Sequence, residues 1–110
     1  MKGTSPNRTE KLYHDALANT IGCIACRQDG QPVSNHVSIH HIDGRTKPGC
    51  HKKVLPLCAQ HHQHDDSDPA GRIGIHPWQA RFEARYGRQM DLNRECNRIL
   101  TTHGYTVGWL

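Results

Sequence analysis

The sequence has no apolar stretch long enough to cross a bilayer and no segment with the pattern of a secretory signal peptide. These absences argue against a membrane protein or an exported one, and we expect a cytoplasmic protein. There is also no internal repeat and no low-complexity tract. Aromatic residues are scarce, and apolar residues make up only 35% of the 110-residue chain. A chain this short and polar buries a thin core, so we expect one domain over residues 1–110 that needs an additional stabilising cross-link such as a disulfide or a structural metal.

Cysteine and histidine are the chemically informative residues that are present. Five cysteines are an odd number, so complete internal pairing into disulfides is impossible. In a reducing compartment, clusters of Cys and His favour metal binding over disulfides. Ten histidines are far more than a chain of this length usually carries. The formal net charge of +4 indicates an anionic partner, for which nucleic acid is the simplest choice.

The hydrophobic spacing predicts an α+β fold. We expect a first helix capped by Ser5 and stopped by Gly22, after a frayed terminus at residues 1–4. A loop rich in Gly and Pro should then lead to two short strands and a helix. The expected ranges of these elements are 22–35 for the loop, 36–42 and 53–57 for the strands, and 58–65 for the helix.

The C-terminal part of the chain is predicted to be helical after a loop at residues 66–74. Pro77 opens one helix, in which Trp78, Phe82 and Tyr86 recur every four residues and form an aromatic face. Asp91 is the expected N-cap of a last helix.

Two ligand pairs with the spacing of zinc knuckles predict a structural metal site. The pairs are Cys23-x-x-Cys26 and Cys58-x-x-His61. Structural zinc favours four tetrahedral Cys and His ligands, and such a site can contribute about 10–16 kcal/mol of apparent binding free energy to folding. The alternative is a set of isolated buried thiols with a surface histidine. A redox Cys-x-x-Cys would normally follow a strand in a βαβ pattern, which the sequence does not contain.

A second set of histidines predicts a reactive metal site. His40 and His41 end the first expected strand, and His62 starts a helical face that also carries Asp66. Imidazole is both a good metal ligand and a base near pH 7, so one histidine of the pair can bind an ion while the other activates water. An ion such as Mg²⁺ or Mn²⁺ held by few protein groups keeps positions open for phosphate and water.

Other polar residues near this set have less certain roles in the sequence. His76 could be an N-cap or a third ligand that folds back on the site. His51 could orient the base or a phosphate. The basic residues that flank the site could clamp a nucleic-acid backbone; they are Arg45, Lys47, Lys52 and Lys53.

The order of these motifs resembles the HNH endonuclease superfamily, which is built on the ββα-metal finger. The matching segments are Cys23-x-x-Cys26, His40-His41-Ile42, and Leu57-Cys58-Ala59-Gln60-His61-His62. A closer resemblance is to the phage Ref family of recombination enhancement functions, which are RecA-dependent DNA nucleases. It is carried by 38–46 (Ser-Ile-His-His-Ile-Asp-Gly-Arg-Thr), 52–58 (Lys-Lys-Val-Leu-Pro-Leu-Cys) and 82–87 (Phe-Glu-Ala-Arg-Tyr-Gly).

The resemblance implies a role for each matching residue. His41 would be the general base, His40 and His62 would be ligands of a catalytic Mg²⁺ or Mn²⁺, and a structural Zn²⁺ would be held by Cys23, Cys26, Cys58 and His61. DNA and the RecA filament would be the partners, in the cytoplasm of the bacterial host cell. The middle Asn of the superfamily pattern is replaced by Lys53, which leaves open which residue orients the base.

Two other classes of function remain open from the sequence. One is a non-catalytic zinc module that binds DNA through a basic helix, with Arg81, Arg85 and Arg88 as its stripe. The other is an interaction protein that only modulates RecA. A pure zinc module needs four ligands and has no use for the second histidine set, so we favour the metal-dependent DNA endonuclease.

Overall fold

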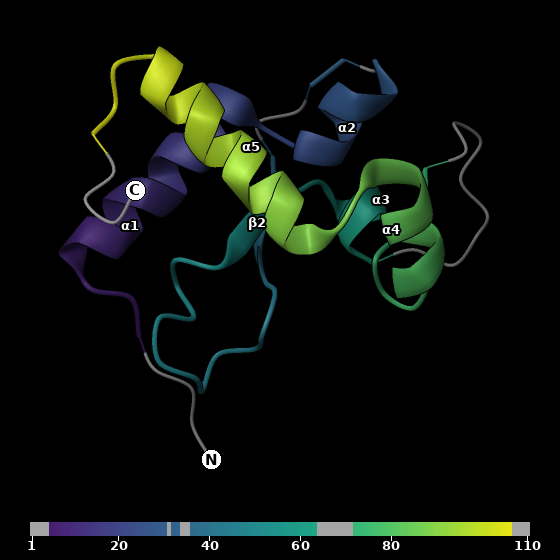
Figure 1. Cartoon of the computed structure of the whole chain (residues 1–110), viewed down its shortest axis with the longest axis horizontal. Coiled ribbons are helices and arrows are strands. Elements are labelled where there is room, and N and C mark those ends of the chain that lie inside the picture. Colours follow the sequence, from purple (N-terminus) through teal and green to yellow (C-terminus); the bar gives the residue numbers. More distant parts are fainter. Residues whose placement is uncertain (1–4, 31, 34–35, 64–71, 107–110) are drawn as a thin grey trace.

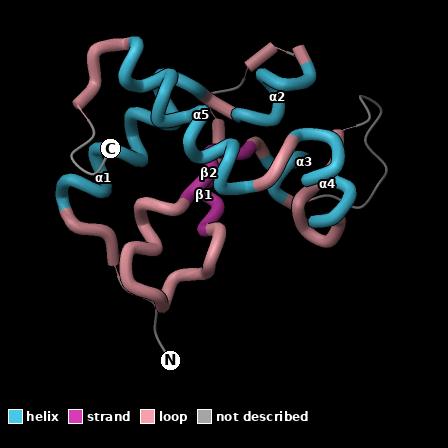
Figure 2. Tube along the Cα trace, viewed as in Figure 1, coloured by secondary structure: helices cyan, strands magenta, loops and turns pink. Residues whose placement is uncertain are grey.

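The fold of the chain comes from a computed structural model that describes residues 5–30, 32–33, 36–63 and 72–106. Residues 1–4, expected to be a frayed terminus, lie outside the described residues. Figures 1 and 2 show a short hairpin surrounded by helices. The elements in chain order are α1 (Arg8–Ala16), the π-helical segment η1 (Leu17–Ile21), α2 (Ile24–Asp29), β1 (Ser38–His41), β2 (Val54–Leu57), α3 (Ala59–His62), α4 (Gln79–Tyr86) and α5 (Gln89–Thr102).

The two strands form an antiparallel pair at the centre of the molecule (Figure 2). Ser38 lies opposite Leu57, and His41 lies opposite Val54. All four residues of β2 are buried, whereas β1 is only partly buried. The strand, loop, strand and helix order that the sequence predicts is therefore confirmed, and with it the α+β class.

Two predicted N-caps, Ser5 and Asp91, are wrong. Asn7, not Ser5, caps α1, because its side chain accepts from the backbone N–H of Glu10 while the Glu10 side chain accepts from the backbone N–H of Asn7. This reciprocal arrangement is a capping box, which satisfies two backbone donors. The last helix begins earlier than predicted, with Arg88 at the N-cap position and Asp91 in its first turn. Asp91 instead pairs with Arg94 on the exposed side of α5.

The segment expected to be a loop from residue 22 to residue 35 contains the short helix α2. Cys23 is its N-cap, with a sulfur that accepts from the backbone N–H of Cys26, and Gly30 ends it in the left-handed conformation at φ 69°. In the opposite direction, α3 is shorter than predicted and ends at His62. Most of the expected loop at 66–74 falls outside the described residues.

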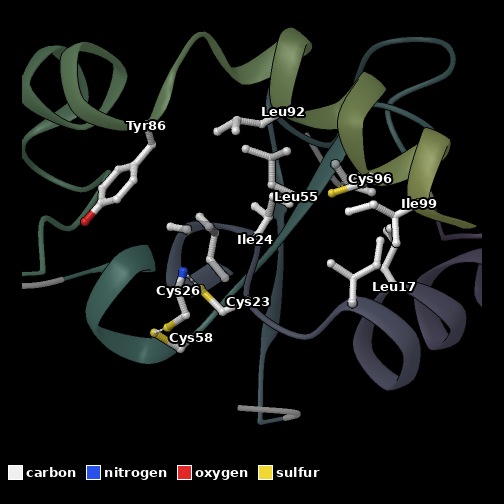
Figure 3. Packing of buried hydrophobic residues seen from close by; sticks show 14 of the residues in the cluster. Leu17, Cys23, Ile24, Cys26, Leu55, Cys58, Tyr86, Leu92, Cys96 and Ile99 are labelled. Atoms are coloured by element: carbon white, nitrogen blue, oxygen red, sulfur yellow. Dashed lines mark hydrogen bonds between the residues drawn. The ribbon is translucent and has the colours of Figure 1, made fainter. Parts of the chain in front are cut away.

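The core lies between α5, the hairpin and the N-terminal helical segment. Figure 3 shows the apolar side of α5 facing β2 and η1, through Leu92, Cys96, Ile99, Leu55 and Leu17. The helix predicted to open at Pro77 begins at Gln79, with Trp78 at its N-cap position. Of the predicted aromatic face, Phe82 and Tyr86 are buried with ring centroids 4.8 Å apart, whereas Trp78 is half-buried. Leu55 and Leu57 of β2 and Cys58, the N-cap of α3, belong to this core, so the core positions the second strand and the start of α3.

Among the described residues, no helix combines the length and the apolar character that a membrane span requires.

Candidate metal centres

Cys23, Cys26, Cys58 and His61 converge as the sequence predicts. The Nδ1 atom of His61 lies 3.4 Å from the sulfur of Cys23, 3.5 Å from that of Cys26 and 3.2 Å from that of Cys58. All four residues are buried, and the three sulfurs are close together in Figure 3. The ligands come from the first turn of α2 and the first turn of α3, so a bound ion would join these two short helices.

The acid–base properties of this cluster fit a cation. The hydrogen bond from Cys23, together with the contact to His61, lowers the pKa of Cys58 to about 3. Burial raises the pKa of Cys26, and the hydrogen bond to Cys58 raises that of Cys23. In the absence of a cation, the cluster therefore favours a thiolate at Cys58 and disfavours ionisation of the other two thiols. A divalent cation bound among the sulfurs would favour the thiolate form of all three, because thiolates are its ligands.

The outer face of this cluster is held by a carboxylate that sequence reasoning did not single out. Asp29, the last residue of α2, accepts from the Tyr86 hydroxyl at 2.7 Å and from Arg85 Nε at 2.9 Å. It also faces Nε2 of His61 at 3.3 Å. Burial raises the pKa of Asp29, but hydrogen bonds from Tyr86, Arg85 and His61 outweigh it and lower that pKa below its usual value. A carboxylate that holds the second nitrogen of a ligand histidine orients the ring toward its metal.

A second group of possible ligands contains only histidines. His40, His62 and His76 each offer a nitrogen, and these nitrogens all lie within 4.8 Å of one another. His76 is brought there by the backbone hydrogen bonds Ile75 N–H to His61 O and His76 N–H to His62 O. Its alternative role as an N-cap is wrong, since Trp78 occupies that position of α4.

The protonation state of these imidazoles also fits a cation. Burial lowers the pKa of His40 and of His62, and it outweighs the hydrogen bond with Gln89 that raises the pKa of His40; the neighbouring histidines lower both pKa values further. Both rings are therefore neutral at pH 7 and keep a lone pair for coordination. The hydroxyl of Ser38 lies 2.6 Å from Nδ1 of His62 and holds that ring in place. Ser38 and His40 share one face of β1 because side chains alternate along a strand.

His41 falls on the opposite face and has different neighbours. Its Nε2 lies 2.9 Å from Nδ1 of His51, and the backbone carbonyl of His51 is 2.8 Å from Nε2 of His14 in α1. Burial, followed by the charges of Arg45, His51 and His14, lowers the pKa of His41 to about 4. His41 is thus neutral at pH 7. The sequence did not identify the residue that orients the proposed base, and in the structure the buried His51 contacts His41.

His40 and His41 nevertheless reach the same cavity, because they end the strand. This cavity has a volume of about 490 Å³ and is lined by both residues together with His62, His76 and Arg45. It is open to solvent on one side and contains room for a phosphate group.

Of the basic residues expected to contact DNA, Arg45 lines this cavity, whereas Lys47 lines a second cavity together with His51. Arg45, Lys47 and Lys53 are exposed, and Lys52 is half-buried. Lys53 lies 3.6 Å from a carboxylate oxygen of Asp43. The basic stripe considered for α4 is interrupted, because Arg85 is paired with Asp29 at 2.8 Å and Arg81 lies over the Trp78 ring. Asp66, a predicted ligand of the catalytic ion, lies outside the described residues.

The fold and the two ligand groups define a small α+β protein with a buried Cys₃His cluster and a solvent-accessible His₃ cluster. The family model described as "Recombination enhancement, RecA-dependent nuclease" matches residues 6–101. The chain belongs to this family, which confirms the resemblance noted from the motifs. The protein is therefore classed among nucleases that act in recombination together with RecA.

Proposed function

We propose that this protein is a metal-dependent DNA endonuclease of the HNH type that hydrolyses backbone phosphodiesters in DNA bound by RecA. The observation that carries the proposal is the convergence of two histidine sets on one open cavity. His40, His62 and His76 form a ligand group that lines it, and His41 lines it as well. The membership of the family supports the reaction class and the RecA dependence.

His41 is the proposed general base. A neutral imidazole can accept a proton from a water molecule that attacks phosphorus, and the lowered pKa of His41 keeps it neutral at pH 7. Its contact with His51 restricts the rotation of the ring, and the residue lines the cavity. Arg45 lines the same cavity and is placed to neutralise a phosphate oxygen.

His40, His62 and His76 are the proposed ligands of the catalytic ion, with Asp66 as a further proposed ligand. When bound, a divalent cation such as Mg²⁺ or Mn²⁺ would stabilise the negative charge that develops on the scissile phosphate and on the leaving oxygen. An octahedral cation has six coordination positions, so these protein groups leave positions open for phosphate and water. The Cys₃His cluster is the proposed site of a structural Zn²⁺, which closes the fold around the hairpin.

Lys47, Lys52 and Lys53 are the proposed backbone contacts of the DNA, beside Arg45. They lie in the connection between β1 and β2, as Arg45 does. Contacts of this kind set position and affinity without reading bases. We further propose that residues 1–110 act as one nuclease domain in the cytoplasm of the bacterial host cell.

A nicking assay tests the proposal. Purified protein loaded with zinc is incubated with plasmid or single-stranded DNA and with Mg²⁺ or Mn²⁺, in the presence and absence of RecA filaments. We expect cleavage by the wild type and a loss of at least about 100-fold for His41→Ala, the range of a general base. His103→Ala, which removes an exposed histidine at the end of α5, is the matched control and should cleave normally. Equal inactivity of wild type and His41→Ala in every combination would refute the proposal, and filament binding without cleavage would favour the modulator.

A further inference from the structure

Gln89, the first residue of α5, places a buried amide against the histidine ligand group. The residue is 8% exposed and lines the cavity. Its Oε1 lies 2.9 Å from Nε2 of His40, and its Nε2 lies 3.2 Å from a carboxylate oxygen of Glu83. The polar end of this side chain thus joins α4, α5 and β1 at the cavity.

The direction of these hydrogen bonds follows from the chemistry of the three groups. An ionised carboxylate can only accept, so the amide nitrogen of Gln89 must face Glu83 and donate to it. The amide oxygen then faces His40 and can only accept. Nε2 of His40 must therefore carry the proton, and Nδ1 is left with the lone pair.

Glu83 is itself held in place by a second amide. Gln79 Nε2 donates to the same carboxylate oxygen of Glu83 at 3.0 Å. The carboxylate is thereby fixed as an acceptor toward Gln89, and the orientation of the Gln89 amide is determined by charge rather than by packing alone.

His62 is oriented by a comparable contact on the opposite side. Ser38 Oγ lies 2.6 Å from Nδ1 of His62 and 3.4 Å from the backbone carbonyl of Leu57. An outer partner therefore contacts one nitrogen of each ring, Nε2 of His40 and Nδ1 of His62. Ligand histidines in metalloproteins are oriented by outer partners of this kind.

We propose that Glu83 and Gln89 are positioning residues that hold His40 as its Nε2-protonated tautomer, so that Nδ1 is the atom that binds the catalytic cation. The inference rests on the proposed function in one respect, that His40 belongs to the cation site. It goes beyond that function because it assigns the coordinating atom and two residues on other elements that determine it.

Nuclear magnetic resonance of the imidazole nitrogens tests the tautomer directly. ¹⁵N-labelled protein, with zinc in the Cys₃His cluster and no other divalent ion, is recorded at pH 7.5, with the His40 signals assigned from a His40→Ala spectrum. We expect a protonated Nε2 and an unprotonated Nδ1 in the wild type. Gln89→Leu, which is similar in volume but has no acceptor, should give a mixture of both tautomers.

Binding of Mn²⁺ alone, followed by electron paramagnetic resonance, gives a second readout. We expect Gln89→Leu to bind about 10–100-fold more weakly than the wild type, the range for loss of an outer partner of a ligand. Arg94→Ala, on the exposed side of the same helix, is the control and should match the wild type in both measurements.

The inference is overturned if wild-type His40 is protonated on Nδ1, or if Gln89→Leu leaves both the tautomer and the Mn²⁺ affinity unchanged. Its failure is distinguishable from failure of the nuclease proposal. A wild type that cleaves DNA while His40 is protonated on Nδ1 retains the proposed function and loses the inference. A wild type that cleaves no DNA, but in which Gln89→Leu changes the tautomer and the Mn²⁺ affinity, retains the inference.

Discussion

Replacement of Asp29 by alanine should destabilise the protein through the Cys₃His cluster. The Asp29 side chain is only 7% exposed, and its carboxylate accepts from the Tyr86 hydroxyl at 2.7 Å and faces Nε2 of His61 at 3.3 Å. His61 is fully buried. Truncation to alanine therefore leaves two buried donors without their anionic acceptor.

The expected magnitude follows from these two donors. A buried donor that loses its partner costs about 1–3 kcal/mol, and more when the lost partner is charged. Nε2 of His61 retains the Tyr86 hydroxyl at 3.0 Å, so the two costs partly overlap and we expect a total of about 3–4 kcal/mol. Arg85 adds little, because its side chain is 54% exposed and its ion pair is screened by water and salt. Such a loss is a large fraction of the about 5–15 kcal/mol that stabilises a typical domain.

Urea denaturation of the zinc-loaded protein measures this loss, and competition with a chromophoric chelator measures the zinc affinity. We expect a zinc affinity about 10–100-fold weaker in Asp29→Ala, because the carboxylate orients the His61 ring. Asp91→Ala is the matched control, since it removes an exposed carboxylate that pairs with Arg94 on α5, and surface changes of this kind shift stability by less than about 0.5 kcal/mol. If Asp29→Ala and Asp91→Ala have the same free energy of unfolding and the same zinc affinity, the reasoning about the Asp29 carboxylate is refuted.

Two further predictions concern metal removal and pH. A chelator should abolish the cooperative unfolding transition, because a structural zinc site contributes about 10–16 kcal/mol to a protein with a thin core. Circular dichroism should show that the transition returns when Zn²⁺ is restored. An unchanged transition in chelator would contradict the structural role of the metal. Burial lowers the pKa of His14 below 6.5. As the pH falls below about 6.5, His14 is protonated more readily in the unfolded chain than in the folded protein, so the free energy of unfolding decreases. His14→Gln keeps a donor toward the His51 carbonyl and should lose less stability than the wild type between pH 7.5 and pH 5.5, which urea titrations at each pH would measure; identical losses would exclude a contribution from His14.

Local patterns in the sequence predicted the parts of the fold that depend on near neighbours. The two ligand pairs were identified from the Cys-x-x-Cys and Cys-x-x-His spacing, which is typical of zinc knuckles. The strands around His40 and Leu55 were recognised from β-branched and apolar residues. The Asn7 cap was missed although its signal, Asn followed three residues later by Glu10, was present in the sequence.

Other features could not be predicted because they depend on distant contacts. The helix α2 is too short to show a hydrophobic period, and its geometry depends on the cluster that it helps to form. Asp29, Ser38 and Gln89 are ordinary polar residues in the sequence. Their roles depend on contacts with residues 19 to 57 positions away along the chain, which no local pattern encodes.

The sequence by itself determined which atoms are available for chemistry: three thiols and one imidazole at knuckle spacing, and a paired histidine at the end of a strand. Tertiary structure alone decided how these histidines are divided. Alternation along β1 directs His40 toward His62 and His76 and directs His41 toward His51. Only the packing of α3, α4 and the connection before β2 determines which residues lie on each face of the strand. The division follows from geometry, because neighbouring residues of a strand point to opposite sides and a sequence does not state what lies there.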